Sequence, residues 1–148
     1  MNEKHKSTGI PRQEDRNTQV EPYAEWTLPE AVERIDRGLS ADILQTLRAQ
    51  LKLSKSELAE LLMVSPRTLD RRKKEGTLPP DESERSFRIG RLTELASGIL
   101  GDMESASRWF REAIFALGER KPMDLVRTEP GARLVEQTLE QIRYGISP

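Results

Sequence analysis

Two helix starts lie so close together in this chain that only a short helix and a tight turn fit between them. Residues 54–76 read SKSELAELLMVSPRTLDRRKKEG. Ser54 is followed three residues later by a glutamate, which is the pattern of a capping box at a helix N-terminus. Ser65 is a second N-cap, and Pro66 suits a first helical turn because no N–H donor is needed there. The segment therefore predicts two short helices joined by a break at residues 63–65.

The apolar side chains of this segment predict how the two helices pack. The first helix has a buried face of Leu58, Ala59, Leu61 and Leu62. The alanine in that face is small enough to let a second helix cross closely. Val64 and Leu69 then point inward, which leaves these residues outside: Arg67, Thr68, Asp70, Arg71 and Lys74. This arrangement is typical of a helix-turn-helix, in which the second helix lies in the DNA major groove.

The outward side chains have the chemistry that DNA recognition requires. Arginine can bind guanine O6 and N7 with two hydrogen bonds, threonine can contact a thymine methyl, and lysine suits phosphates. We predict base contacts from Arg67, Thr68 and Arg71, and contacts with the DNA backbone from Arg72, Lys73 and Lys74. The alternative is a helical hairpin with a solvated basic face, since motif matches of this length also occur without function.

Basic residues are concentrated in the same part of the chain. The formal net charge of all 148 residues is -1, but residues 50–76 contain seven basic and four acidic side chains. The two flanking parts are both net acidic. A local positive patch favours DNA, because neutralising phosphates releases condensed counterions. The excess of positive charge is modest, so we expect tight binding to require two copies of the chain, as a homodimer.

The rest of the chain also predicts helices, so the expected fold class is all-α. One helix should start at Thr27, which forms a capping box with Glu30, and stop at Gly38. Its apolar residues fall on one face: Leu28, Ala31, Val32, Ile35 and Leu39. Further helices are expected within residues 40–53, 83–100, 102–117 and 128–145, the last two capped by Asp102 and Thr128.

Composition divides the chain into three parts. Residues 1–25 are polar and poor in apolar side chains, so burial could not offset the cost of ordering them, and we predict a flexible leader. Residues 26–79 form a helical N-terminal region that contains the helix-turn-helix, and residues 80–148 form a second helical domain. Two adjacent prolines in TLPPDESE predict a linker between these domains.

Composition argues against an enzyme or a metalloprotein. The chain has no cysteine, and its one histidine is His5 in the polar N-terminal part. Thiolate chemistry is therefore excluded, and imidazole catalysis has almost nowhere to occur. We predict no catalytic residue, no metal site and no cofactor. No segment approaches the roughly 20 apolar residues of a membrane span, so no membrane contact is predicted and the cytoplasm is the expected location.

Residues 54–76 resemble the helix-turn-helix of the Xre, or Cro/repressor-like, regulators. The segment LAELL, the residues VS before the second helix and the closing Gly76 are in the places that this family leads us to expect. One departure is Met63, where many relatives have glycine. Glycine relieves a left-handed turn residue, so a methionine there should cost about 1 kcal/mol.

The C-terminal part resembles the toxin-binding domain of MbcA/ParS/Xre-type antitoxins. That pattern joins an aromatic WF helix, an LG...P.DL turn and a T..G...V...L..I.YG helix. The matching residues are Trp109, Phe110, Leu117, Gly118, Pro122, Asp124, Leu125, Thr128, Gly131, Val135, Leu139, Ile142, Tyr144 and Gly145. A departure is Glu119, where many relatives have a second glycine, so the turn is expected to differ locally.

The resemblance implies an antitoxin whose partner is a RES-domain toxin, a small enzyme that consumes NAD. Such antitoxins are expected to repress their own operon by binding operator DNA, and to cover the entrance to the toxin's nucleotide site with C-terminal residues. In this chain the covering residues would be Arg143, Tyr144, Gly145, Ile146, Ser147 and Pro148. The glycine ends the last helix and leaves a short tail with a free carboxylate, which could enter a cleft built for an anion. A homodimer would join a larger complex with the toxin.

Other interpretations stay open. The chain could be a stand-alone Xre-like transcriptional regulator whose C-terminal module serves dimerisation or another protein partner. The tail could be an ordinary frayed terminus. Among the remaining residues, Trp109 and Leu139 are expected in the core, whereas Arg133 and Glu136 are expected on a solvated face.

Overall fold

The structure is a computed structural model that describes residues 22–145 of the chain. Its elements are η1 Tyr23–Glu25, α2 Leu28–Arg37, α3 Asp42–Gln50, α4 Lys55–Leu61, α5 Pro66–Glu75, α6 Pro80–Leu100, α7 Met103–Arg111, η2 Phe115–Leu117, α8 Pro122–Leu125 and α9 Glu129–Arg143. The described residues form no strand beyond two isolated bridges, Ser40 with Thr77 and Ile114 with Arg120. The all-α prediction is confirmed.

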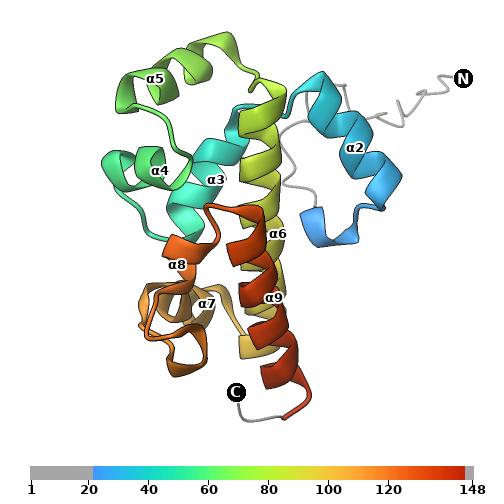
Figure 1. The fold of residues 1–148 in the computed structure, drawn as a ribbon. Coiled ribbons are helices and arrows are strands. Elements are labelled where there is room, and N and C mark those ends of the chain that lie inside the picture. The colour runs from blue at the N-terminus through green and yellow to red at the C-terminus, as the bar shows by residue number, and fades with distance from the viewer. Residues whose placement is uncertain (1–21, 146–148) are drawn as a thin grey trace, which may run out of the picture.

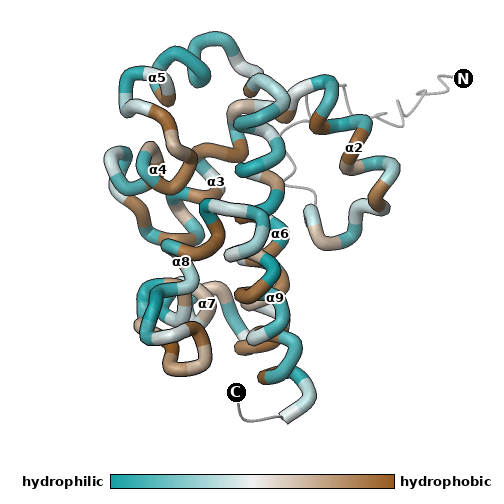
Figure 2. The backbone as a smooth tube through the Cα atoms, viewed as in Figure 1, coloured by the Kyte–Doolittle hydropathy of each residue, from teal (hydrophilic) through white to brown (hydrophobic). Residues whose placement is uncertain are grey.

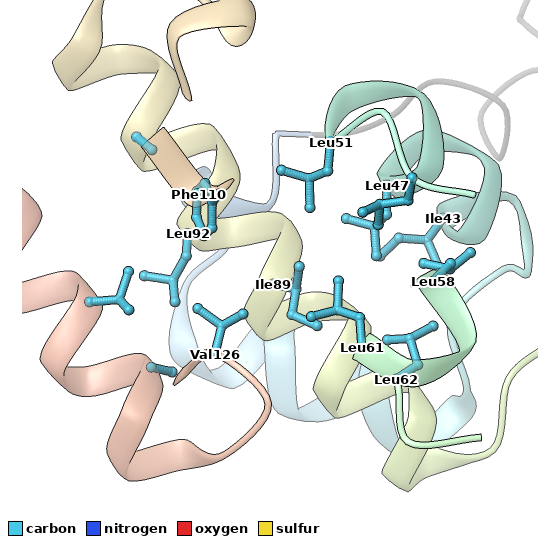
Figure 3. Packing of buried hydrophobic residues seen from close by; sticks show 14 of the residues in the cluster. Ile43, Leu47, Leu51, Leu58, Leu61, Leu62, Ile89, Leu92, Phe110 and Val126 are labelled. Atoms are coloured by element: carbon cyan, nitrogen blue, oxygen red, sulfur yellow. The ribbon is translucent and has the colours of Figure 1, made fainter. Parts of the chain in front are cut away.

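The long helix α6 is the axis of the fold (Figure 1). It packs against η1, α2 and α3 from the N-terminal part and against α7 and α9 from the C-terminal part. The segment predicted as a linker is the start of this helix, because Pro80 occupies the first turn, where its missing N–H donor is harmless. One hydrophobic cluster extends across the predicted boundary at residues 79 and 80. Figure 3 shows Phe110 beside Leu92 and Val126 near Ile89, and all four belong to the same cluster as Leu61.

Two side-chain contacts also join the two halves. The Arg111 guanidinium, at the end of α7, donates hydrogen bonds to the carbonyl oxygens of Leu51, at 2.5 Å, and Lys52. These carbonyls lie at the C-terminus of α3, where a helix leaves acceptors without intrahelical partners. Arg88 of α6 similarly donates to the Arg127 carbonyl oxygen at 3.1 Å. The helix-turn-helix and the C-terminal helices therefore form one packed unit.

The two caps of the helix-turn-helix are formed as predicted. Ser54 Oγ accepts from the Glu57 N–H at 3.1 Å, and the Glu57 carboxylate accepts from the Ser54 N–H at 3.0 Å. Ser65 Oγ accepts from the Thr68 N–H at 3.1 Å. The predicted inner face of α4 is buried, with Leu58, Ala59, Leu61 and Leu62 all in the core. The hydrophilic helix α5 then crosses α4 with most of its length exposed (Figure 2).

Both departures from the family pattern adopt the backbone conformation that a glycine would favour. Met63 in the turn has a φ of 60°, and Glu119 in the later loop has a φ of 62°. The turn after α4 closes normally, because the Val64 N–H donates to the Ala59 carbonyl oxygen at 3.0 Å. The left-handed conformation costs a non-glycine residue about 1–2 kcal/mol. Both positions therefore carry that cost, and the turn at Met63 keeps its geometry.

The end of the predicted leader is ordered. Tyr23 is buried, and its ring meets the Trp26 ring edge-on with centroids 5.1 Å apart. The Glu94 carboxylate of α6 accepts from the backbone N–H groups of Tyr23, at 3.0 Å, and Ala24, at 2.8 Å. Burial raises the pKa of Glu94. The leader prediction is therefore wrong for residues 22–25, and residues 1–21 lie outside the described part of the chain.

Two other helix predictions need correction. The capping box of Thr27 and Glu30 at the start of α2 is confirmed. Leu28 and Val32, which lie on the apolar face of this helix, are nevertheless exposed. The helix packs on α6 mainly through Ala31. The helix predicted over 102–117 ends at Arg111. Its continuation is replaced by a tight loop, described below, that the aromatic spacing did not reveal.

Candidate functional site

The outer face of α5 brings together most of the residues predicted to contact DNA. A shallow hollow on this face is lined by Ser65, Arg67, Thr68, Asp70, Arg71 and Lys74. Arg67, Arg71 and Lys74 are exposed, while the half-buried Thr68 has its hydroxyl 3.0 Å from that of Ser65. Lys73 is exposed but lines a different hollow, between α3, α4 and α5. The arrangement presents two guanidinium groups and an ammonium group to an anionic ligand.

Arg72 does not belong to this face. Its Nε donates to the Glu82 carboxylate at 2.6 Å, one terminal nitrogen donates to the same carboxylate at 2.9 Å, and the other donates to Glu75 at 3.1 Å. The arginine side chain is 15% exposed and that of Glu82 is 8% exposed. Hydrogen bonding to Glu82 raises the pKa of Arg72 further above its usual range. The prediction that Arg72 contacts the DNA backbone is therefore inconsistent with its position.

An acidic residue in the centre of the α5 face is neutralised by the preceding helix. Asp70 accepts a hydrogen bond from Lys55 Nζ at 2.6 Å. This bond lowers the pKa of Asp70. An unpaired carboxylate here would repel phosphates, so the lysine keeps the face suited to DNA. The sequence does not reveal this pair, because the two residues are on different helices.

The second predicted site lies at the end of α9. Tyr144 is 72% exposed, and it closes a shallow hollow on α9 that is also lined by Arg133, Glu136, Gln137, Glu140 and Gln141. Arg143 lies 3.6 Å from Glu140, and Gly145 ends the described chain with a φ of 69°. The remaining predicted residues, Ile146, Ser147 and Pro148, lie outside the described residues. The structure thus leaves the visible part of the predicted tail accessible.

Two further expectations for α9 have different outcomes. Arg133 pairs with Glu129 on the exposed face, as predicted. Glu136 instead accepts two hydrogen bonds from Arg91 of α6, at 2.8 and 3.0 Å, which lower the pKa of this carboxylate. Glu136 therefore helps to fix α9 against α6. Trp109 of α7 and Leu139 of α9 are in the core, as predicted.

The T..G spacing at the start of α9 has a physical cause. Thr128 Oγ1 caps the helix by accepting from the Gly131 N–H at 3.2 Å. A Cβ atom at residue 131 would lie 1.9 Å from the Leu125 carbonyl oxygen. Only glycine allows α8 and α9 to approach so closely. The glycine therefore sets the position of α9 and, with it, of the candidate site at its end.

Neither a metal site nor a membrane span is found in residues 22–145. No three side chains among His, Cys, Asp and Glu in this range are grouped so that they could hold a metal ion. No helix in it is both long and apolar enough to cross a bilayer.

The two halves match two known domain families. Residues 30–91 match the antitoxin Xre-like helix-turn-helix domain, and residues 95–145 match the antitoxin Xre/MbcA/ParS C-terminal toxin-binding domain. A protein named antitoxin Xre from Yersinia enterocolitica is 31% identical over 117 residues, which cover 78% of this chain and 79% of that protein. The chain belongs to the Xre antitoxin family. It is an antitoxin with a helix-turn-helix domain and a toxin-binding domain.

Other relatives agree with this assignment, and one solved structure has a similar fold. An antitoxin Xre from Pseudomonas putida is 31% identical over 76% of this Xre antitoxin and 70% of that protein. A Prs ADP-ribosylating antitoxin from Sphingobium is 28% identical over 93% of this chain and 95% of that protein. The fold resembles a chain of the M. tuberculosis MbcT-MbcA toxin-antitoxin complex, with a TM-score of 0.56 and 21% identity over 73% of this chain and 96% of that chain.

The two candidate sites of this Xre antitoxin are far apart in the fold. The α5 face lies near one end of α6, and the C-terminus of α9 lies near the other (Figure 1). The two family matches meet between residues 91 and 95, within α6. The two candidate sites therefore do not overlap.

Proposed function

We propose that this antitoxin inhibits a RES-domain toxin that consumes NAD, and that it represses its own operon by binding operator DNA. It does so as a homodimer within a larger toxin-antitoxin complex, and it has no enzymatic activity of its own. The observation that carries this proposal is the separation of an exposed basic α5 face from an exposed α9 end, each within the matching domain family. The name of the Sphingobium relative supports a connection with NAD, because ADP-ribosylation consumes NAD.

The toxin is inhibited by a plug at the end of α9. Tyr144 and the residues after it cover the nucleotide entrance of the toxin. This role is supported by the exposure of Tyr144 and by the left-handed conformation of Gly145 just after the helix end.

Operator DNA is bound by the outer face of α5. Arg67, Thr68 and Arg71 contact base edges, while Lys73 and Lys74 contact phosphates. The proposal leaves out Arg72, because its guanidinium is held by two carboxylates of this chain. Two copies in a dimer would place their α5 helices in successive major grooves, with half-sites about 34–36 Å apart.

We expect Arg67→Ala and Arg71→Ala each to weaken operator binding by about 1–3 kcal/mol, because each removes a bidentate base contact. Gel-shift titration measures this loss, and toxin neutralisation should survive in both variants. A matched control is Arg133→Ala, since Arg133 and Arg71 are both exposed and both pair with a glutamate one helical turn away. If the three variants bind the operator equally well, the α5 face is only a solvated basic surface.

Removing residues 145–148 should weaken toxin inhibition much more than operator binding. The plug is lost, whereas the α5 face at the other end of α6 is unchanged. Residual NAD consumption by the toxin, measured with saturating truncated antitoxin, should rise well above that with the full chain. An equal loss of both activities would contradict a plug and indicate a general loss of structure.

The proposal as a whole is tested by co-purification with the product of the neighbouring gene, followed by an NAD-consumption assay. A neighbouring RES-domain reading frame whose product is bound and inhibited supports the antitoxin role. If co-expression leaves NAD consumption and toxicity intact, the proposal fails. The remaining candidate would then be a stand-alone transcriptional regulator that keeps the α5 face.

A further inference from the structure

The loop between α7 and α8 exposes an aromatic side chain. Phe115 is 82% exposed, the highest value among the large hydrophobic side chains that are exposed in the described residues. A phenylalanine in this position leaves a large apolar area in water, where burial by a partner would be favourable. We call residues 112–121, which surround this side chain, the Phe115 loop.

The Phe115 loop is held in one conformation by its own backbone. The Ile114 N–H donates to the Arg120 carbonyl oxygen at 3.1 Å, and the Glu119 N–H donates to the Ile114 carbonyl oxygen at 3.0 Å. Gly118 and Glu119 both adopt left-handed conformations that close the loop. The exposed ring is therefore held by a preorganised backbone, so the loop loses less conformational entropy when a partner binds.

One side chain of the loop anchors it to the toxin-binding domain. Leu117 is buried, and η2 packs against α9. The exposed alanines 113 and 116 lie next to Phe115 along the loop, and exposed charged residues stand at both ends of it: Glu112, Glu119, Arg120 and Lys121. An apolar centre within a charged rim is the composition of a protein-protein hot spot.

We propose that the Phe115 loop is a second contact with the cognate toxin, one that anchors the toxin independently of the C-terminal plug. This inference rests on the proposed function. The loop lies within residues 95–145, which match the toxin-binding family, and it lies toward the same end of the molecule as the C-terminus of α9 (Figure 1). A toxin held by the plug would therefore be close to Phe115. A protein partner fits the loop better than DNA, because its exposed centre is apolar and its charged residues include two glutamates beside Arg120 and Lys121.

Phe115→Ala should weaken the affinity for the cognate RES-domain toxin about 10- to 100-fold, the loss expected when one aromatic hot spot is truncated. Leu28→Ala is the matched control, because Leu28 is 81% exposed but lies on α2, outside the toxin-binding match. It should leave the affinity unchanged. Both side chains are exposed, so unchanged thermal unfolding will verify that both variants fold.

The anchor and the plug differ in the titration curve of toxin inhibition. With Phe115→Ala, the midpoint should shift to higher antitoxin concentration, while NAD consumption is still fully suppressed at saturation. With residues 145–148 removed, the suppression should stay incomplete at saturation. Identical curves for the two variants would overturn separate roles for the loop and the tail.

Two further results would overturn the inference. The first is a toxin affinity of Phe115→Ala within about twofold of wild type, because a change that small is below the loss expected for a hot spot. The second is a Phe115→Ala variant that loses self-association in light scattering while its toxin affinity is kept, which assigns the loop to the contact between two antitoxin copies. If the wild-type chain binds no RES-domain toxin, the proposed function fails first, and this wild-type result distinguishes the two failures.

Discussion

Gly131→Ala is expected to lower the free energy of unfolding by about 3 kcal/mol or more, at the upper end of what overpacking costs. The added Cβ would lie 1.9 Å from the Leu125 carbonyl oxygen and 3.0 Å from the Thr128 hydroxyl. The first of these neighbours is backbone, so it can yield only if α8 and α9 move apart. Chemical denaturation measures the loss. Toxin binding should fall with it, because the site at the end of α9 moves.

Gly98→Ala is the control for this prediction. Gly98 is also in a helix, but a Cβ there would meet no atom within 4 Å. Alanine favours a helix over glycine, so this variant should gain up to about 1 kcal/mol of stability. If the free energy of unfolding falls in Gly131→Ala and rises in Gly98→Ala, then steric contact, and not helix propensity, is the reason that residue 131 must be glycine. A Gly131→Ala variant as stable as wild type would mean that α8 and α9 do not approach so closely.

Arg72→Ala is the second variant with a large expected effect. It should destabilise the chain by about 3 kcal/mol, because the half-buried Arg72 is the main partner of the buried Glu82 carboxylate, which would be left uncompensated. The partner is Glu82, which is buried at the start of α6. Thermal or urea unfolding measures the loss. Operator binding should fall as well, but only because α5 loses its attachment to α6.

A double substitution separates stability from DNA contact. In Arg72→Met with Glu82→Leu, apolar side chains of similar size replace both charges, and stability should return close to that of wild type. If this double variant binds the operator normally, Arg72 only positions α5. If it is stable but does not bind, Arg72 contacts DNA after all. Arg71→Ala provides the comparison, since it should lose operator binding without losing stability.

The helix-turn-helix was predictable because its signals are local. Ser54 and Ser65 each cap a helix through a hydrogen bond to a residue three positions later. The left-handed conformation of Met63 was also predictable, because the turn leaves the residue there no other backbone conformation. Such signals do not depend on the rest of the fold, so they can be found in the sequence alone.

The remaining features depend on contacts between distant residues. The exposure of Leu28 depends on α2 packing on α6 through Ala31. The half-buried position of Arg72 depends on a glutamate beyond two prolines. The early end of α7 depends on the Ile114 bridge with Arg120, while the aromatic spacing favoured a longer helix. The Phe115 loop was missed for the same reason.

The single helix α6 makes the antitoxin a fixed spacer. Its 21 residues span about 30 Å at the usual rise per residue. A bound toxin would therefore sit at a set distance and angle from the operator, without the freedom that a jointed connection would allow. When two antitoxin copies bind one palindromic operator, the spacing of the two half-sites would then set the distance between the two bound toxins. That distance decides whether the two toxins can touch.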